Sequence, residues 1–318
     1  MRARWILGKA HCLGVAALVW LLFASASGRA DTIALSLGWN PGVIQKFDST
    51  GQGSVFASGL IAPGGLAFDK SGNLYAADSG NGQYGTGSIY RYNSNGNGSL
   101  FAGPASGVNT PEGLAFDSSG TLYVANHGNG TIEKFDPSGH GSMFAVIGSP
   151  FGLAFDSSSN LYVAAMGSPG MILKVDSSGH VSTFASGLNN PWGLAFDSTG
   201  NLYVANYGGG PGSNDGSIYR FDPNGNRSGF ASGLYGPEGI AFDSNGNLFV
   251  AMEYGSPSNY FTGYIEEFDS SGNGSVFASG LHQPTFIAVQ VPEPATWVLL
   301  ALGIGALLGA LRLPRRSS

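Results

Sequence analysis

The sequence predicts an all-β fold, a six-bladed β-propeller with four antiparallel strands per blade, and a recurring phrase carries this prediction. The phrase reads Pro-x-Gly-Leu-Ala-Phe-Asp, then a Ser/Gly turn, then Asn-Leu-Tyr-Val-Ala. Two further short apolar runs separate successive phrases. Units of about 40–45 residues with four strands are typical of propeller blades. The proline of the phrase occurs at six positions, spaced 39 to 48 residues apart: Pro63, Pro111, Pro150, Pro191, Pro237 and Pro284.

Each unit is expected to hold strands A to D in order, joined as antiparallel hairpins. The phrase supplies strands A and B, with Asp117 to Gly120 as one example of the A–B turn. Strands C and D follow, joined by turns such as Asp136 to Gly139. Asp at the first position caps such a turn through its side chain, and Gly supplies the positive φ at its end.

The strand count predicts how the ring closes. Strands C and D each occur six times, whereas the sixth strand A is the fragment Pro284 to Val289, with no strand B after it. Thr32 to Leu37 supplies the missing strand at the other end of the chain. The last blade is therefore expected to combine one C-terminal strand with three N-terminal strands, which leaves no open seam in the ring.

Composition and charge exclude some classes of function. Gly accounts for 52 of the 318 residues, but 42% of the chain is hydrophobic, which is enough for a core. Between the two ends lie 19 acidic and 7 basic residues, a net charge of −12, which would repel a phosphate backbone and argues against nucleic-acid binding. The single cysteine, Cys12, lies in the leader, so the folded domain is expected to contain no disulfide.

Residues 1–30 have the three-part form of a secretory signal peptide. Arg2, Arg4 and Lys9 precede an apolar run from Leu13 to Phe23, and small residues follow. Cleavage by signal peptidase is expected after Ala26 or Ala30. The propeller is then predicted to span residues 31–290.

Residues 291–318 form a second targeting segment. Val291, Pro292, Glu293 and Pro294 precede an apolar stretch over 295–311, expected to be a transmembrane helix of about 25 Å. A basic tail over 312–318 follows. This order resembles the PEP-CTERM sorting signal of Gram-negative bacteria. The resemblance implies transient anchoring in the inner membrane, removal of the tail by an exosortase-type protease, and release to the cell surface or extracellular matrix. The three basic residues of the tail are Arg312, Arg315 and Arg316.

The motifs Gly-Leu-Ala-Phe-Asp and Leu-Tyr-Val-Ala-Asn resemble those of NHL-type propellers, and the resemblance covers residues 32–290. They also resemble those of the wider gluconolactonase/senescence-marker (SMP-30) and virginiamycin B lyase-like group. This group contains both enzymes and pure binding modules, so the fold alone does not assign a function.

Alternating strand direction places the variable B–C loops and the D–A connections on one face, which is the predicted functional face. Two sets of positions are expected to meet there around the axis, one at the start of strand A and one just after strand B. Their oxygens suit Ca²⁺ or another divalent cation, and in gluconolactonase-like relatives such a set holds a metal. The alternative, which we favour, is that these side chains cap turns and bind water. The candidate ligands are Glu112, Glu238, Asp78, Asn126 and Asn206.

Aromatic residues on the same loops suit stacking against sugar rings or gripping a peptide. We therefore expect a monomeric, non-enzymatic binding module for a polysaccharide or protein on the cell surface or in the extracellular matrix. The alternative is a divalent-metal-dependent lactonase- or lyase-like enzyme with its site in the central channel. The aromatic candidates are Trp39, Tyr84, Trp192, Tyr207, Tyr254 and Tyr260.

Overall fold

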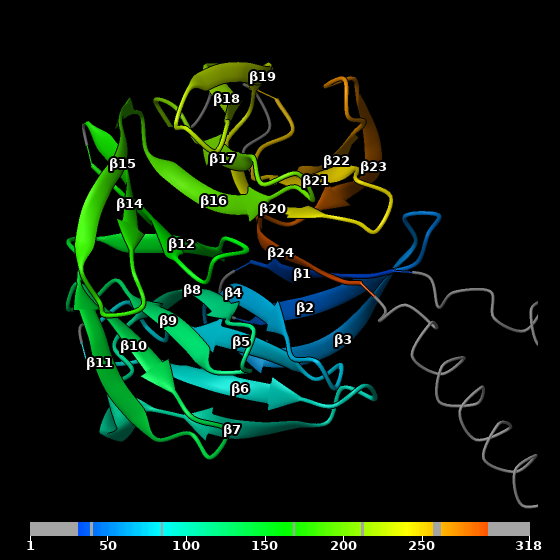
Figure 1. Ribbon diagram of the computed structural model, residues 1–318. Helices are drawn as coiled ribbons and strands as arrows, with labels where there is room; N and C mark the ends of the chain where they lie inside the picture. Colours follow the sequence, from blue (N-terminus) through cyan, green and yellow to red (C-terminus); the bar gives the residue numbers. More distant parts are fainter. Residues whose placement is uncertain are drawn as a thin grey trace, which may run out of the picture. The chain divides into compact units, whose positions relative to one another are not determined.

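The computed structural model describes residues 31–38, 41–83, 85–167, 169–210, 213–256 and 262–291. Within these residues, 24 strands form six four-stranded sheets, in which all neighbouring strands are antiparallel. Figure 1 shows the sheets around a common centre, with one strand of each sheet innermost and one at the rim. The six-bladed propeller predicted from the repeat is confirmed.

Five blades are continuous in sequence. Blade 1 consists of β4 (Pro63–Phe68), β5 (Leu74–Asp78), β6 (Ser88–Tyr92) and β7 (Gly98–Ala102). A short 3₁₀ helix, η1 (Pro104–Ser106), leads into the next blade. Blade 2 consists of β8 (Pro111–Phe116), β9 (Leu122–Asn126), β10 (Thr131–Phe135) and β11 (Gly141–Val146). Blade 3 consists of β12 (Pro150–Phe155), β13 (Leu161–Ala165), β14 (Gly170–Val175) and β15 (Val181–Leu188).

Blade 4 consists of β16 (Pro191–Phe196), β17 (Leu202–Asn206), β18 (Gly216–Phe221) and β19 (Arg227–Leu234). Blade 5 consists of β20 (Pro237–Phe242), β21 (Leu248–Met252), β22 (Gly263–Phe268) and β23 (Gly274–Leu281). The closing blade takes its strands from both ends of the domain, in the order β24 (Pro284–Gln290), β1 (Thr32–Leu37), β2 (Gly42–Phe47) and β3 (Gly53–Leu60).

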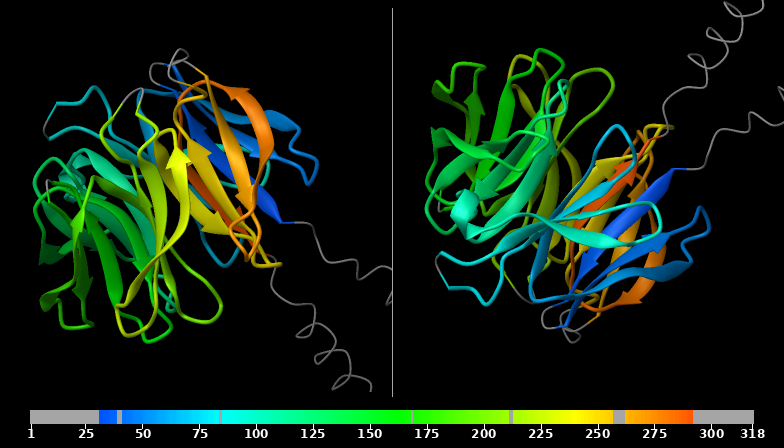
Figure 2. Two further views of the ribbon diagram at one scale, coloured as in Figure 1. Left: turned by 90° about the horizontal axis from the view of Figure 1, so that it is seen from above. Right: turned by 90° about the horizontal axis from the view of Figure 1, so that it is seen from below.

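The closing blade confirms the predicted strand exchange. Thr32 is opposite Gln290, and Leu35 is opposite Ile287 in the β1–β24 pair. Figure 2 shows the start of β1 and the end of β24 side by side. Both therefore lie on the face of the A–B and C–D turns, because β24 runs from the B–C loop face towards those turns.

The turns use their aspartates as the sequence predicted. Oδ1 of Asp117 accepts hydrogen bonds from the backbone N–H of Ser119 at 2.8 Å and of Thr121 at 2.9 Å. Gly120 N–H donates to the Asp117 carbonyl at 3.1 Å. The same Asp-based pattern recurs in the other A–B turns, which makes this face short and uniform.

Packing between neighbouring blades forms the core. A tyrosine of strand B contacts one ring from strand D of its own blade and one ring from strand A of the next. Tyr75, for example, lies 5.0 Å from both Phe101 and Phe116, edge to face in each case. Phe249 fills the equivalent position in blade 5. Six clusters of buried apolar residues lie around the ring, and in the closing blade Ala34 stands in place of the tyrosine.

The inner strands approach one another so closely that their contact points require glycine. A Cβ on Gly113 would lie 2.0 Å from the carbonyl oxygen of Phe151, and one on Gly152 would lie 1.9 Å from that of Trp192. The glycine of the phrase therefore lets backbone pack on backbone at the centre of the ring. In β24 the corresponding residue is Phe286.

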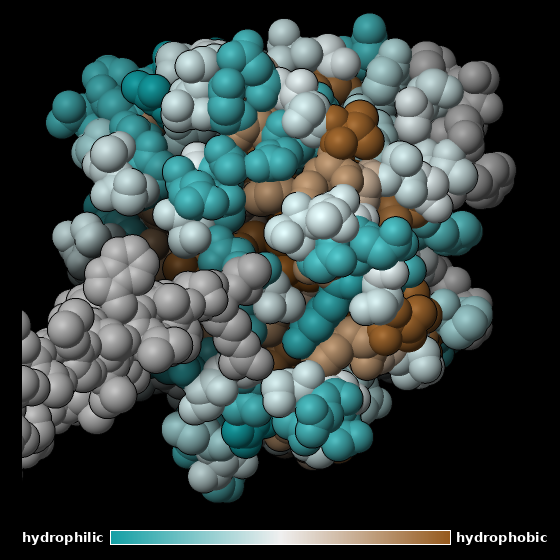
Figure 3. Space-filling view, turned by 90° about the vertical axis from the view of Figure 1, so that its right-hand side faces the viewer, coloured by the Kyte–Doolittle hydropathy of each residue, from teal (hydrophilic) through white to brown (hydrophobic). Residues whose placement is uncertain are grey.

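The rim exposes single apolar side chains rather than a large apolar surface. Figure 3 shows one side of the molecule, where small apolar areas are separated by polar ones. Such scattered residues are normal on a protein surface and do not indicate a docking site. Residues of the outer strands that are more than half exposed include Val55, Leu100, Met143, Val146 and Val276.

Among the described residues, no helix is long and apolar enough to cross a membrane. The predicted signal peptide and the predicted apolar helix over 295–311 lie outside those residues.

Candidate functional site

A local irregularity at the start of each inner strand builds the site. In β12, Pro150 is opposite Ala165, but the register then shifts, and regular pairing resumes at Leu153. The same shift follows the proline in β4, β8, β16 and β20. Such bulges redirect side chains, so the residue after each proline is released from the ladder. These six residues encircle the axis on the B–C loop face, and we call this ring the mouth: Gly64, Glu112, Phe151, Trp192, Glu238 and Thr285.

Three of the expected metal ligands accept hydrogen bonds from the backbone of the loops that lead into their own blades. Asp78 Oδ1 accepts from the backbone N–H of Ala62 at 2.9 Å, and Asn126 Oδ1 accepts from that of Asn109 at 3.0 Å. Asn206 Oδ1 likewise accepts from Asn189 N–H at 2.7 Å. Each is the last residue of its strand B and holds the D–A connection in place.

The next residue in each blade faces the mouth instead. Ser79 Oγ donates to the carbonyl of Pro111 at 2.7 Å and lies 3.1 Å from Glu112 Oε1. The ring of His127 lies 4.7 Å from that of Phe151. Side chains alternate along a strand, so these positions could have been found by moving one residue beyond the Asp and Asn positions.

Two carboxyl groups meet on one side of the mouth. Glu238 is only 2% exposed and is hydrogen-bonded to Glu253. Burial, followed by the adjacent Glu253, raises the pKa of Glu238 well above its ordinary value. Tyr207 donates its hydroxyl to Glu253 Oε2 at 2.7 Å and lies 2.9 Å from the Tyr254 hydroxyl. Glu253, the second member of this pair, was not among the residues predicted from the sequence.

Glu112 forms a third acidic position of the mouth. Burial raises its pKa to about 7, and the hydrogen bond from Ser79 opposes that rise. Its carboxylate lies over Gly64, where a Cβ would be 3.1 Å from Oε2. Gly64 therefore leaves room for this carboxylate.

Aromatic rings line the other side of the mouth. Phe151 lies 4.7 Å from Trp192, and Trp192 stacks on Tyr207 at 5.7 Å with an interplanar angle of 26°. Tyr207 in turn contacts Tyr254. The aromatic side and the carboxyl pair are thus joined through Tyr207.

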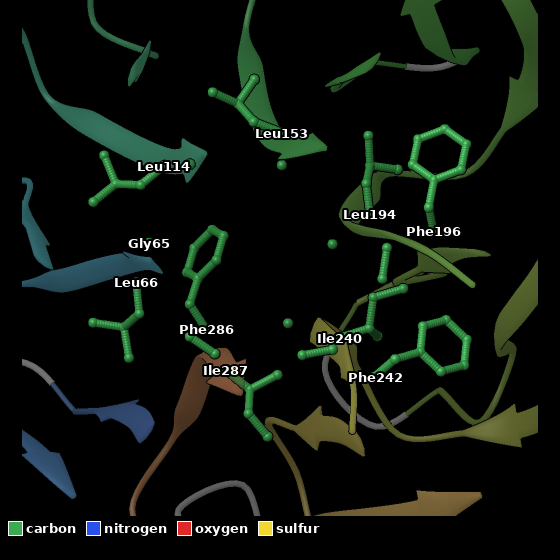
Figure 4. A pocket seen from close by; sticks show the side chains of 17 residues that line it. Gly65, Leu66, Leu114, Leu153, Leu194, Phe196, Ile240, Phe242, Phe286 and Ile287 are labelled. Carbon is green, nitrogen blue, oxygen red and sulfur yellow. The ribbon is translucent and has the colours of Figure 1, made fainter. Parts of the chain in front are cut away.

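Phe286 closes the mouth from below. Figure 4 shows its ring pointing into the central channel among Leu66, Leu114 and Ile240. The channel cavity measures about 280 Å³ and is lined by glycines and apolar side chains. Trp192 lies 6.3 Å from Phe286. A polar ligand is therefore favoured at the mouth and not deeper in the channel.

Three buried polar atoms among the described residues have no hydrogen-bond partner; two belong to residues of the mouth, and the third belongs to His127, which contacts Phe151 of the mouth. They are Nδ1 of His127, Nε1 of Trp192 and Oε2 of Glu238. Buried polar atoms are rarely left unpaired in native proteins, so their gathering in one place indicates a site that receives a polar ligand. Burial also lowers the pKa of His127.

The candidate metal ligands differ in their surroundings. No group of three or more His, Cys, Asp and Glu in the described ranges is arranged to hold a metal ion. The amide oxygens of Asn126 and Asn206 already accept backbone hydrogen bonds. Trp192, Tyr207 and Tyr254 come together at the mouth, whereas the other three aromatic candidates, Trp39, Tyr84 and Tyr260, lie outside the described residues.

Replacing Glu238 with glutamine should stabilise the protein by about 2 kcal/mol at pH 8, because an amide removes the cost of a buried charge. Folding raises the pKa of Glu238, so the protonated side chain favours the folded state. The wild-type protein therefore loses stability as the pH rises above 4.5, the ordinary pKa of a glutamate side chain. The gain from Glu238→Gln should vanish at pH 4, which thermal unfolding at the two pH values will show.

A matched control is Asp48→Asn. Hydrogen bonds from Thr50 and Gln52 hold the pKa of Asp48 low, so this change should lower stability at pH 8. If Glu238→Gln destabilised the protein equally at both pH values, the buried charge would not be the dominant effect.

Comparison with protein-family models finds matches in four parts of the chain. The SMP-30/Gluconolactonase/LRE-like region matches residues 29–166, and an NHL repeat matches residues 188–210. A strictosidine synthase-like N-terminal region matches residues 231–256. The PEP-CTERM protein-sorting motif matches residues 290–316 and supports export of the protein. These matches confirm the resemblances inferred from the repeat phrase and from the C-terminal segment.

Solved structures agree on the fold. Virginiamycin B lyase from Staphylococcus aureus has a TM-score of 0.52 at 14% identity, over 73% of this chain and 85% of that chain. A putative gluconolactonase has a TM-score of 0.59 at 14% identity, over 80% of this chain and 97% of that chain. A gluconolactonase from Xanthomonas campestris has a TM-score of 0.54 at 18% identity, over 82% of this chain and 86% of that chain. No curated protein matches the sequence.

Proposed function

We propose that this exported propeller is a binding module that holds a polysaccharide at its mouth, without chemical conversion of the ligand. The observation that carries the proposal is the gathering of His127 Nδ1, Trp192 Nε1 and Glu238 Oε2, three buried polar atoms without partners. Beside them, the stacked rings of Trp192 and Tyr207 offer a flat apolar surface. Sugars present both hydroxyl groups and an apolar ring face, so they match both features.

The two targeting segments suggest where this binding takes place. We propose that the apolar stretch after Val291 anchors the protein transiently in the inner membrane and that an exosortase-type protease then removes it. The PEP-CTERM match over residues 290–316 supports this route. The mature propeller would act at the cell surface or in the extracellular matrix.

A glycan array and a peptide array, each probed with the full-length protein, test the binding function. Replacing Trp192 with alanine should weaken the binding of any captured glycan by about tenfold or more, because stacking and a hydrogen-bond donor are lost together. Tyr219→Ala, on β18 outside the mouth, should leave binding unchanged. Capture of peptides and no glycans would point to a protein partner instead.

The second candidate is a divalent-metal-dependent lactonase- or lyase-like enzyme with its site in the central channel. The match of residues 29–166 to the SMP-30/Gluconolactonase/LRE-like region supports it. Calorimetry with Ca²⁺, Mn²⁺ and EDTA separates the two candidates. A metal response that is lost when Glu112 and Glu238 are both replaced by alanine would favour the enzyme, whereas we expect no response.

A further inference from the structure

The basic residues of the propeller lie on one face, which also carries the aspartates of the turns. The described residues contain seven lysines and arginines, and all of them lie near the A–B or C–D turns. Five are the penultimate residues of strands C, one begins β19, and one lies in the β4–β5 turn: Lys46, Arg91, Lys134, Lys174, Arg220, Arg227 and Lys70.

The opposite face carries acids without basic residues to balance them. Glu112 and Glu238 belong to the mouth, Glu253 is hydrogen-bonded to Glu238, and the charge of Glu112 acts on Glu238. Within the described part of the chain, no residue at the mouth is a lysine or arginine. A mouth of this kind attracts cations and repels anions such as sugar acids or phosphates.

The contacts within the mouth join these carboxyl groups to an aromatic surface. Trp192 stacks on Tyr207, whose hydroxyl donates to Glu253. Glu253 in turn bonds to Glu238, whose Oε2 is buried and has no donor. One ligand group could therefore lie over aromatic faces and donate hydrogen bonds to carboxylates at the same time. Ammonium groups make both interactions.

We propose that the group recognised at the mouth is the free ammonium of an amino sugar, within a polysaccharide whose hexosamine residues lack N-acetyl groups. The inference rests on the proposed polysaccharide-binding function and specifies its ligand. The ammonium donates to Glu253 and supplies the missing donor to Glu238 Oε2. The apolar face of the sugar ring packs on Trp192, and Phe286 keeps the sugar at the mouth.

Two other cations fit the mouth less well. A divalent metal ion requires six to eight oxygen ligands, whereas aromatic rings line one side of the mouth. A lysine side chain carries an ammonium group but no ring face for Trp192. A hexosamine residue uses the carboxyl pair and the aromatic side together.

Titration calorimetry of the full-length protein with two matched probes tests the proposal. The probes are oligomers of glucosamine and of N-acetylglucosamine of the same length, in which the amine is either free and charged or acetylated and neutral. The glucosamine oligomer should bind at least about tenfold more tightly, and added salt should weaken its binding. Glu253→Gln should reduce this affinity about tenfold or more. Glu267→Gln on β22 makes the same charge change away from the mouth and should keep the affinity.

The possible outcomes separate this inference from the function on which it rests. Equal binding of both oligomers would overturn the ammonium inference and leave polysaccharide binding standing. Binding of neither oligomer, together with an empty glycan array, would overturn both. Binding of a lysine-rich peptide but of neither oligomer would also overturn the inference and point to a protein partner. An affinity that Glu253→Gln leaves unchanged would place the ammonium outside the mouth.

Discussion

Replacing Gly152 with alanine is expected to destabilise the propeller by about 3 kcal/mol or more. The added Cβ would lie 1.9 Å from the carbonyl oxygen of Trp192 and 3.0 Å from its carbonyl carbon. Both atoms are backbone of the neighbouring inner strand, so no side-chain rotation can relieve the overlap. Blades 3 and 4 would have to move apart at the centre of the ring. Denaturant unfolding followed by circular dichroism measures the loss.

Gly229→Ala is the matched control for this change. Gly229 also lies within a strand, β19, but a Cβ there meets no atom within 4 Å. Alanine restricts the unfolded chain, so the control should be neutral or stabilising by up to about 1 kcal/mol. Similar losses in both variants would mean that the close approach of the inner strands is not what requires glycine at Gly152.

Ending the chain after Gln283 should abolish cooperative unfolding altogether. This truncation removes β24, whose buried residues Phe286 and Ile287 each contribute about 2 kcal/mol through apolar burial. It also leaves β1 without a neighbour on one side. The combined loss is comparable with the total stability of about 5–15 kcal/mol that is typical of a domain.

Differential scanning calorimetry on two truncated chains tests this expectation. A chain that ends after Val291 keeps β24 and should unfold in one sharp transition, whereas a chain that ends after Gln283 should show none. A synthetic peptide covering residues 284–291 should restore the transition in the shorter chain. A sharp transition in the shorter chain without the peptide would show that the ring is stable without closure.

The fold was predictable because each blade repeats the same arrangement of four strands and their turns. The spacing of prolines such as Pro63 and Pro111, the capped turns and the unmatched strands at the two ends together define six blades. The strand from Thr32 to Leu37 is short and apolar, and only the strand count indicated its partner. That argument succeeds because every strand in a closed ring must find a neighbour.

The site was less predictable, since it depends on what varies between blades. Glu112, Glu238 and Trp192 were found because they occupy the variable position of the repeated phrase. Asp78 and Asn126 were expected to cap turns in preference to binding a metal, and both accept hydrogen bonds from backbone N–H groups of the D–A connections. Because side chains alternate along a strand, the residue that follows each of these positions is the one that faces the mouth.

Residues outside the phrase were harder to recognise. Glu253 lies one residue beyond Met252, at the start of a long loop, and nothing in the sequence pairs it with Glu238. Phe286 stands where the other inner strands carry glycine. The sequence alone does not indicate that its ring turns into the channel.

The β1–β24 pair joins the first and last strands of the propeller, and this affects the order of events during export. A chain that emerges from its N-terminal end exposes the edge of β1 long before residues 284–290 arrive. Pairings this distant in sequence form late, and unpaired edges invite aggregation and proteolysis in the meantime. The sorting motif begins directly after β24, so it becomes available only when the last strand of the ring is also present. The last strand of the ring and the motif therefore become available at the same stage of export, and a chain broken before residue 284 lacks both.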